Sequence, residues 1–501
     1  MIPTLIKKLS PLLSRVEWTV WGFLVVSLPI TSLPLISALA GGSMVAPPAG
    51  LLALGFFAVW LIPQWVRGRS LPRHAIPLLV FCGGVLVSGL AAYFIEFPAF
   101  RSVNFTRSQL VELVTLAVGV CTYLVTASYL SDERRMLATL RWINWSGLAV
   151  ILWSVVQFFV WQTTKDYPVL IEEIQKAISI SRLYPGRVTG FALEPSWLAH
   201  QLNMLYLPLW LAATVRRFSA HGWRIVRLSL ENLLLAAGVG VLWFSLSRVG
   251  LVAFLLMLAL VFILLNVQAV GWLERRILLH RKPGRISPQT ARRLLRVALT
   301  VVLILVYIAL LVGAAFLLSK LDWRMARLFD VNTLTQDGLM VYANQLIIAE
   351  RIVFWQAGWD VFNDHPWLGV GLSNSGYFFA EKMPAFGYGL VEINQNLYRE
   401  TGLPNTKALW VRLLAETGLL GFALFCAWLL VQWAGGADLA HSPSRLQRSL
   451  GLAAQFVVLG LLVEGFSVDT FALPYYWFAL GAGAAVWKVF PPKPKHGLES
   501  T

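Results

Sequence analysis

The sequence predicts an all-α integral membrane protein with about twelve transmembrane helices. Of its 501 residues, 57% are hydrophobic and only 13% are charged. The apolar residues gather in runs of about 18 to 22 residues, and a helix of that length crosses a hydrocarbon core of about 30 Å. Because backbone that faces lipid must satisfy its hydrogen bonds internally, each run is expected to be a helix.

Twelve runs are long enough to count as spans. They cover residues 18–37, 48–66, 75–95, 109–130, 142–162, 196–215, 229–246, 249–267, 297–318, 408–433, 450–467 and 472–490. The first two contain Pro29, Pro34 and Pro63, and only a tight turn at residues 247–248 separates the seventh from the eighth. We expect residues 1–501 to form a single polytopic membrane domain.

Basic residues lie in alternate loops, and this sets the expected orientation. The loops on one side carry Arg67, Arg134, Arg216 and Arg445 among others, and short loops rich in Lys and Arg are retained in the cytoplasm. Both termini fall on that side. The net charge of +16 is spread over these short loops, so contact with anionic membrane lipid explains it better than nucleic-acid binding does.

Two long segments fall on the opposite side of the membrane. In residues 163–195, apolar positions alternate with Glu172, Glu173 and Lys176, a pattern typical of a helix that lies in the membrane interface. Residues 319–407 separate the ninth and tenth spans and are expected to be largely helical, with one helix over 340–362. A long polar segment in such a chain is usually where function sits.

Arginines on this second side are informative, because the retention of basic loops in the cytoplasm does not require them there. Arg187 precedes the sixth span, Arg248 opens the eighth, and Arg351 lies on the expected loop helix. A guanidinium matches phosphate oxygens bidentately and is costly to dehydrate unless it is paired. The three arginines therefore predict a pyrophosphate site. The alternative for each is that it anchors a span or pairs with a carboxylate, and Arg182, Arg399 and Arg412 are secondary companions.

Other polar residues on this side have less specific patterns. The carboxylates are numerous and include Glu194, Glu392 and Glu400; any of them could be a base, a solvated charge or an ion-pair partner. No cluster of His, Cys and Asp has metal-ligand spacing, so a reaction without metal is the simpler expectation.

Aromatic residues and one histidine add candidates for sugar contact. Trp355 and Trp359 follow Arg351 at every fourth position, so the three share one helix face. These tryptophans could stack on sugar rings or belong to the ordinary aromatic belt of a membrane protein. His365 precedes Pro366 and is interpreted either as a turn residue or as a glycan contact.

Several of these residues fall in motifs that resemble the O-antigen ligase and polymerase superfamily. The motifs are Glu350-Arg351-x₃-Trp355-x₇-Asn363-Asp364-His365-Pro366-Trp367-Leu368-Gly369-Val370-Gly371, then Pro404-Asn405-Thr406, then Leu414-Ala415-Glu416-Thr417-Gly418-Leu419-Leu420-Gly421. Arg187 with Glu194-Pro195, and Arg248 at the start of a span, are similar to the family's two recurrent arginine positions. The resemblance covers roughly residues 185–425.

The resemblance implies a GT-C-type glycosyltransferase in the bacterial inner membrane, with both long loops periplasmic. Its donor would be an undecaprenyl-pyrophosphate-linked oligosaccharide, attacked by an acceptor hydroxyl with inversion and without a cofactor. Arg187, Arg248 and Arg351 would bind the pyrophosphate, whose growing negative charge requires such stabilisation. Asn405 would contact the glycan, and part of the active site would lie in residues 319–407.

One departure from the family pattern bears on function. Family members have His-Asn where this chain has Pro404-Asn405, so activation of the acceptor would pass to Glu194, Glu392 or Glu400. The missing histidine favours a polymerase of O-antigen or exopolysaccharide repeats over an O-antigen ligase or a protein O-oligosaccharyltransferase. A polysaccharide chain-length regulator is a candidate partner.

A transporter is the alternative from a different class. A polysaccharide-lipid flippase would carry polar residues near the middle of the membrane, and Glu464 is the main acidic residue deep in an expected span.

Overall fold

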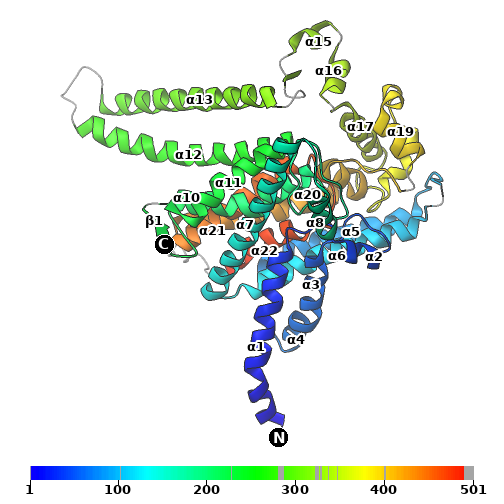
Figure 1. Ribbon diagram of the computed structural model, residues 1–501, viewed down its shortest axis with the longest axis horizontal. Helices are drawn as coiled ribbons and strands as arrows, with labels where there is room; N and C mark the ends of the chain where they lie inside the picture. The colour runs from blue at the N-terminus through cyan, green and yellow to red at the C-terminus, as the bar shows by residue number, and fades with distance from the viewer. Residues whose placement is uncertain are drawn as a thin grey trace, which may run out of the picture. The chain divides into compact units, whose positions relative to one another are not determined.

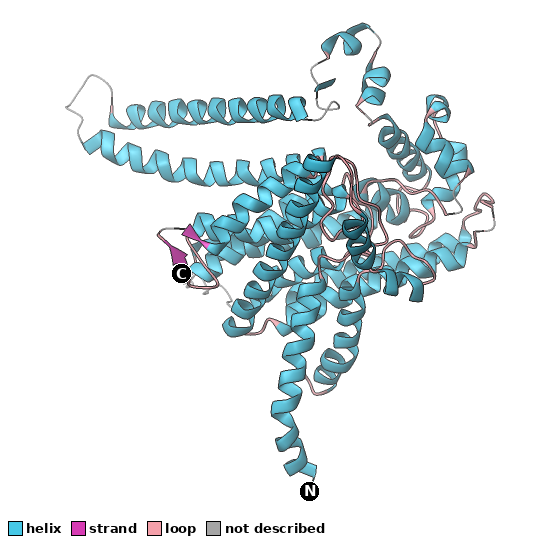
Figure 2. Ribbon diagram, in the orientation of Figure 1, coloured by secondary structure: helices cyan, strands magenta, loops and turns pink. Residues whose placement is uncertain are grey.

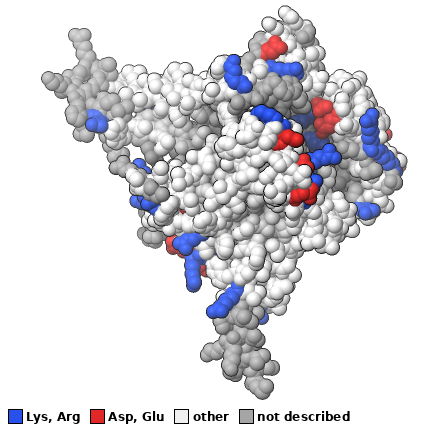
Figure 3. Space-filling model, in the orientation of Figure 1, with Lys and Arg blue, Asp and Glu red and all other residues white. Residues whose placement is uncertain are grey.

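The computed structural model describes residues 2–101, 103–226, 228–279, 287–321, 326–327, 330–336, 338–346, 348–399 and 402–489. Figures 1 and 2 show that these residues form helices almost throughout. The two-residue strands β1 (Arg224–Ile225) and β2 (Leu228–Ser229) are the only strands in this part of the chain. Most of the surface in Figure 3 carries neither basic nor acidic side chains. The predicted all-α membrane class is confirmed, and the protein is a multi-pass membrane protein.

Eight helical segments in the described ranges are long and apolar enough to cross a membrane. They are Pro48–Val66, Arg73–Phe94, Phe105–Tyr129, Glu133–Thr164, Arg248–Val267, Gln289–Leu317, Leu409–Asp438 and Arg445–Glu464. The remaining expected spans coincide with helices that are shorter, interrupted or less apolar, namely α1 (Ile2–Ser27), α9 (Pro195–Gln201) with α10 (Leu207–Arg216), α11 (Leu230–Phe244) and α22 (Pro474–Val489). The count of twelve therefore stays a prediction.

The described chain divides into two compact units. The first comprises Met1–Ala253 and Val353–Thr501, and the second comprises Phe254–Ile352. The helices confined to the first unit are α1 (Ile2–Ser27), α2 (Pro34–Leu39), α3 (Pro48–Phe56), α4 (Ile62–Val66), α5 (Ile76–Ala91), α6 (Phe105–Tyr129), α7 (Glu133–Thr164), α8 (Val169–Ile178), α9 (Pro195–Gln201), α10 (Leu207–Arg216), α11 (Leu230–Phe244), α18 (Phe379–Lys382), α19 (Val391–Tyr398), α20 (Leu409–Asp438), α21 (Arg445–Glu464) and α22 (Pro474–Val489).

Within the first unit, the central helices pack in pairs that are distant in sequence. Helix α22 packs on α6, α20 on α5, and α10 on α21. A π-helical turn, Leu202–Tyr206, joins α9 to α10. Helices α20, α21 and α22 also pack on one another, so polar residues at their ends can meet.

The second unit holds α13 (Pro288–Leu321), α15 (Val331–Gln336), α16 (Leu339–Gln345) and most of α12 (Arg248–Leu279). Helices α12 and α13 run side by side (Figure 1), where the Tyr307 hydroxyl donates to the Leu255 carbonyl at 2.7 Å. The single helix expected over 340–362 is wrong, because the chain leaves α16 at Leu346 and α17 (Ala349–Asp364) begins afterwards.

The first expected span, residues 18–37, is also wrong in its boundaries. Helix α1 ends at Ser27 and α2 is a separate short helix with Pro34 in its first turn. Proline has no N–H to donate within a helix. Between the helices, Leu33 N donates to Ala46 O, and Ala46 N to Thr31 O, both at 3.0 Å, so this extended stretch finds its partners in the chain before α3.

Helix α20 is interrupted at Gly418, which has a φ of 63° and a ψ of −169°. The chain after α17 supplies the hydrogen bonds that this break requires. Val370 N donates to Ala415 O at 3.0 Å, and Gly371 N donates to Glu416 O at 2.8 Å. After the break, Leu419 N donates to the carbonyl of residue 366 at 2.8 Å. Irregular backbone at membrane depth is tolerated where protein satisfies it.

The break explains why glycine recurs in both motifs. A Cβ at Gly418 would lie 2.3 Å from Trp367 O, and a Cβ at Gly369 would lie 2.5 Å from the Glu416 carbonyl carbon. Both glycines also have positive φ, which residues with a side chain rarely adopt. Residues 363–371 and 414–421 therefore form a structural pair, which we call the helix-break clamp.

Replacing Gly418 tests the helix-break clamp. Gly418→Ala should lower the free energy of unfolding in mixed micelles by about 2 to 4 kcal/mol, because the new methyl group meets backbone and the φ is strained. Gly240→Ala is the matched control, since Gly240 is helical with no atom within 4 Å of a built Cβ. Equal stability of the two variants would contradict the clamp.

Candidate functional site

Arg187 and Arg248 are brought to the same end of α11. Val188 N donates to Phe244 O at 3.3 Å, and Arg187 Nε donates to Ser245 O at 2.9 Å. Arg248 follows Ser245 by three residues and is the first residue of α12. Arg187 and Arg248 therefore belong to one local stretch of structure, and the start of a long helix adds a partial positive charge. This arrangement suits a phosphate group.

Glu194 belongs to the same surroundings through Tyr184. Burial raises the pKa of the Tyr184 hydroxyl; Glu194 raises it further, and Arg187 lowers it. Both charges therefore act on one phenol. Glu194 is the residue before α9, and its carboxylate accepts a hydrogen bond from the Ser196 hydroxyl. Glu194, Arg187 and Tyr184 thus lie in the same part of the fold.

A second polar cluster surrounds Arg412, which is only 6% exposed. Its Nη2 lies 2.9 Å from Glu112 Oε1, and its Nε lies 2.9 Å from Glu416 Oε2. The remaining Nη1 donates to Asp469 O at 2.6 Å. Pairing with carboxylates therefore accounts for the charge of Arg412.

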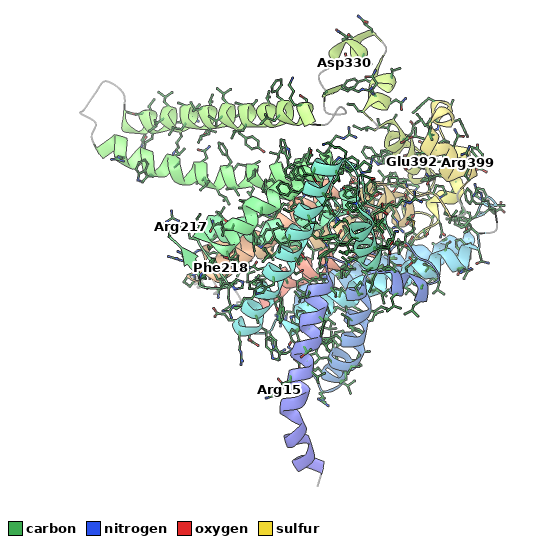
Figure 4. All side chains as sticks on the ribbon, in the orientation of Figure 1. Arg15, Arg217, Phe218, Asp330, Glu392 and Arg399 are labelled. Atoms are coloured by element: carbon green, nitrogen blue, oxygen red, sulfur yellow. The ribbon has the colours of Figure 1, made fainter. Side chains whose placement is uncertain are left out.

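Asn405 and Glu392 lie near this second cluster. Asn405 Nδ2 donates to Asp469 Oδ1 at 3.4 Å, and the backbone N–H of Lys407 donates to Asp469 Oδ2 at 3.0 Å. Lys407 Nζ lies 3.5 Å from Glu392 Oε1. Figure 4 labels Glu392 and Arg399 near the two ends of α19. Glu392 thus neutralises Lys407, and Asp469 organises the chain that enters α20.

Sequence reasoning missed Asp469 and Glu112. Asp469 lies between α21 and α22 and is 8% exposed, while Glu112 lies in the second turn of α6. Neither belongs to a motif, and their partners are far away in the sequence. The available signal was that each is an acidic residue at the edge of an apolar run, where an ion-pair partner is needed.

The tryptophans and His365 lie on or after α17. Trp355 is partly buried against Phe466, with ring centroids 5.7 Å apart, and its Nε1 finds no hydrogen-bond partner among the described residues. Trp359 is 49% exposed. His365 lies 5.8 Å from the Phe378 ring. Of these side chains, Trp355 is the one with a buried donor that lacks a partner among the described residues.

Two predicted site residues cannot be placed in this site. Arg351 lies in the first turn of α17 but belongs to the second compact unit, so its approach to Arg187 and Arg248 stays a prediction. Glu400 lies outside the described residues. Within those residues, no group of three or more His, Cys, Asp or Glu side chains is placed to hold a metal ion.

Part of the chain is similar to a known protein family. Residues 233–426 match a model of the O-antigen ligase family. This segment of the chain is similar to an O-antigen ligase domain. This domain includes Arg248, Arg351 and Asn405 together with the helix-break clamp, and the family activity is of the glycosyltransferase type. A search of curated proteins found no match to the chain. The earlier resemblance to the O-antigen ligase and polymerase superfamily is confirmed.

The Arg412 cluster should be essential to the stability of the O-antigen ligase domain. Arg412→Met leaves buried carboxylates without their cation and should cost about 3 to 5 kcal/mol of unfolding free energy in mixed micelles. Arg399→Met removes an exposed arginine and should cost less than about 1 kcal/mol. Similar stability of the two variants would contradict a structural role for Arg412.

His365 should contribute to the pH dependence of stability. Burial lowers the pKa of His365 below its ordinary 6.5, with Asp364 opposing and Lys382 adding to the shift. The unfolded chain therefore takes up a proton more readily than the folded chain, and stability is lost as pH falls through and below about 6.5. His365→Gln should reduce the fall in melting temperature between about pH 7.5 and 5. An unchanged pH profile in this variant would refute the assignment.

Proposed function

We propose that this protein is a Wzy-type polysaccharide polymerase of the bacterial inner membrane. It transfers a glycan from polyprenyl pyrophosphate to a lipid-linked acceptor repeat of O-antigen or exopolysaccharide at the periplasmic face. The observation that carries the proposal is the hydrogen bond from Arg187 to Ser245, three residues before Arg248. It brings the Arg187 guanidinium to the backbone that leads into α12, and Arg248 lies in the O-antigen ligase domain.

The two arginines bind the donor and stabilise the leaving group. As the acceptor oxygen bonds to the anomeric carbon, the bond between that carbon and the pyrophosphate oxygen breaks, and the electron pair leaves with undecaprenyl pyrophosphate. Negative charge therefore grows on the pyrophosphate in the transition state. Guanidinium groups that are already oriented stabilise this charge without reorganisation. Arg351 contributes from the loop helix.

Glu194 is the best candidate among the predicted bases. It shares Tyr184 as a neighbour with Arg187, whereas Glu392 is occupied by Lys407 at 3.5 Å. Glu194 therefore accepts the proton that the acceptor hydroxyl loses as it attacks. The inverting reaction needs no further base, because the pyrophosphate leaves as an anion.

The glycan is contacted by Trp355, Trp359, His365 and Asn405. Trp355 Nε1 is suited to donate to a sugar hydroxyl, since an indole N–H that is buried without an acceptor is costly. Polymerase is favoured over ligase because proline replaces the family histidine before Asn405. Asn405 is instead held by Asp469. A chain-length regulator in the same membrane is the proposed protein partner.

Glu464 is the residue that favoured the transporter alternative. Glu464 is the last residue of α21, at a helix end and not in its middle. It is fully buried, and its Oε1 accepts from Asn203 Nδ2 at 2.7 Å. A carboxylate held in this way suits a structural role better than a transport pathway.

Arginine variants test the proposed function. Arg187→Ala or Arg248→Ala should each lower polymerisation of a synthetic lipid-linked oligosaccharide by purified protein at least about 100-fold, since each removes a cation from the leaving group. In cells the same variants should shorten a long glycan ladder to single repeats while the protein still inserts. Arg107→Ala, at an exposed position that belongs to no part of the proposed site, should leave the ladder unchanged.

The products distinguish the alternatives. Longer lipid-linked chains support a polymerase, whereas transfer to a lipid A-core or to a peptide identifies a ligase or an O-oligosaccharyltransferase. If correctly folded protein leaves the substrate unchanged, the result would indicate a transporter. Full polymerisation by both arginine variants would refute the pyrophosphate site.

A further inference from the structure

Gln157 is a fully buried glutamine on α7 that no motif includes. Its side chain makes a set of hydrogen bonds to the segment that follows Arg187. Gln157 Oε1 accepts from Thr189 N at 2.9 Å and from Gly190 N at 3.0 Å. Its Nε2 lies 3.3 Å from Thr189 Oγ1 and from Gly190 O, to which it donates. One amide thus satisfies both polar groups of the Gly190 backbone.

The same amide also contacts α8. Gln157 Nε2 donates to Gln175 Oε1 at 3.0 Å, and Trp153 Nε1 donates to that oxygen at 2.9 Å. Gln175 is 1% exposed, whereas Val169 and Leu170 on the same helix are 74% and 69% exposed. Helix α8 therefore presents apolar residues outward, as an interfacial helix does, and turns one polar residue inward to Gln157.

Hydrogen bonds hold the backbone directly after Arg187 at two places. Residues 189 and 190 are held by Gln157, and Val188 N is held by Phe244 O at 3.3 Å. Gly190 has a φ of 55°, and a Cβ there would lie 3.1 Å from Leu198 and Ser154. The segment after Arg187 consequently has little conformational freedom. This fixed backbone orients the Arg187 guanidinium toward the Ser245 carbonyl.

We propose that Gln157 is a positioning residue for the donor pyrophosphate: its buried amide fixes the 188–190 backbone so that Arg187 faces the ligand, and it joins this segment to α8. The inference rests on the proposed function. It requires no contact between Gln157 and the substrate. Loss of the amide should therefore act on the affinity for pyrophosphate through a shift of Arg187, because small misplacements of a binding group are costly.

The experiment measures binding of farnesyl pyrophosphate to the purified full-length protein. Gln157→Leu preserves size but leaves the Thr189 and Gly190 N–H groups without an acceptor, and should weaken binding by about 10- to 100-fold. Gln162→Leu removes an exposed glutamine from the same helix and should change affinity less than about twofold. Arg187→Ala serves as the reference for loss of the ligand contact.

Gln157→Glu provides a readout that a merely structural role would not change. A protonated carboxyl reproduces the amide, because its C=O accepts the two N–H groups and its O–H donates to Gln175 Oε1. An ionised carboxyl faces the oxygens of Gln175 and Gly190 without a proton to share. The affinity of the Gln157→Glu variant for farnesyl pyrophosphate, relative to wild type, should therefore fall as pH rises. If Gln157→Leu does not fold, this variant tests the proposal in its place.

The outcomes separate this inference from the proposed function. Wild-type protein that does not bind farnesyl pyrophosphate overturns both. Binding that Arg187→Ala abolishes, but that folded Gln157→Leu retains at wild-type strength, overturns the positioning role alone. A pH-independent affinity ratio for Gln157→Glu also overturns it.

Discussion

Backbone N–H and C=O groups inside a membrane have no water to bond, and this constraint governs the irregular parts of the structure. At the helix-break clamp, the groups freed around Gly418 are satisfied by the chain after α17. Around Arg187, the polar groups of residues 188–190 are satisfied by Gln157 and by Phe244. Each irregular segment is therefore held by several hydrogen bonds. A charged side chain that belongs to such a segment has a defined direction.

The arginines of this face divide into two kinds by the same reasoning. A buried guanidinium needs partners for its donors and its charge, and Arg412 finds them in Glu112, Glu416 and the Asp469 carbonyl. Arg187 Nε donates to the Ser245 carbonyl, on the segment that leads to Arg248. Arg412 holds the bundle together, whereas Arg187 is proposed to bind an anionic ligand.

The sequence was sufficient for the helical class, because hydropathy is a local property. It also singled out Arg187 and Arg248, which lie at one end of α11, and their role in binding stays a prediction. It was insufficient for Asp469 and Glu112, whose partners Asn405 and Arg412 are distant in the chain and follow no period. It also misjudged residues 18–37, since α1 ends at Ser27, just before Pro29, and Pro34 begins a separate helix inside the same apolar run. The motif around Gly369 could be interpreted only beside Gly418, because its role is to complete another helix.

The most direct measurement is cross-linking of cysteines placed at positions 187 and 248. The natural cysteines, Cys82, Cys121 and Cys426, are free and would first be replaced by alanine. If the segment before α9 lies against the end of α11, a short bismaleimide should join the two positions within one folded molecule. Failure to cross-link, when each single cysteine still reacts with a simple maleimide, would contradict the shared arginine site.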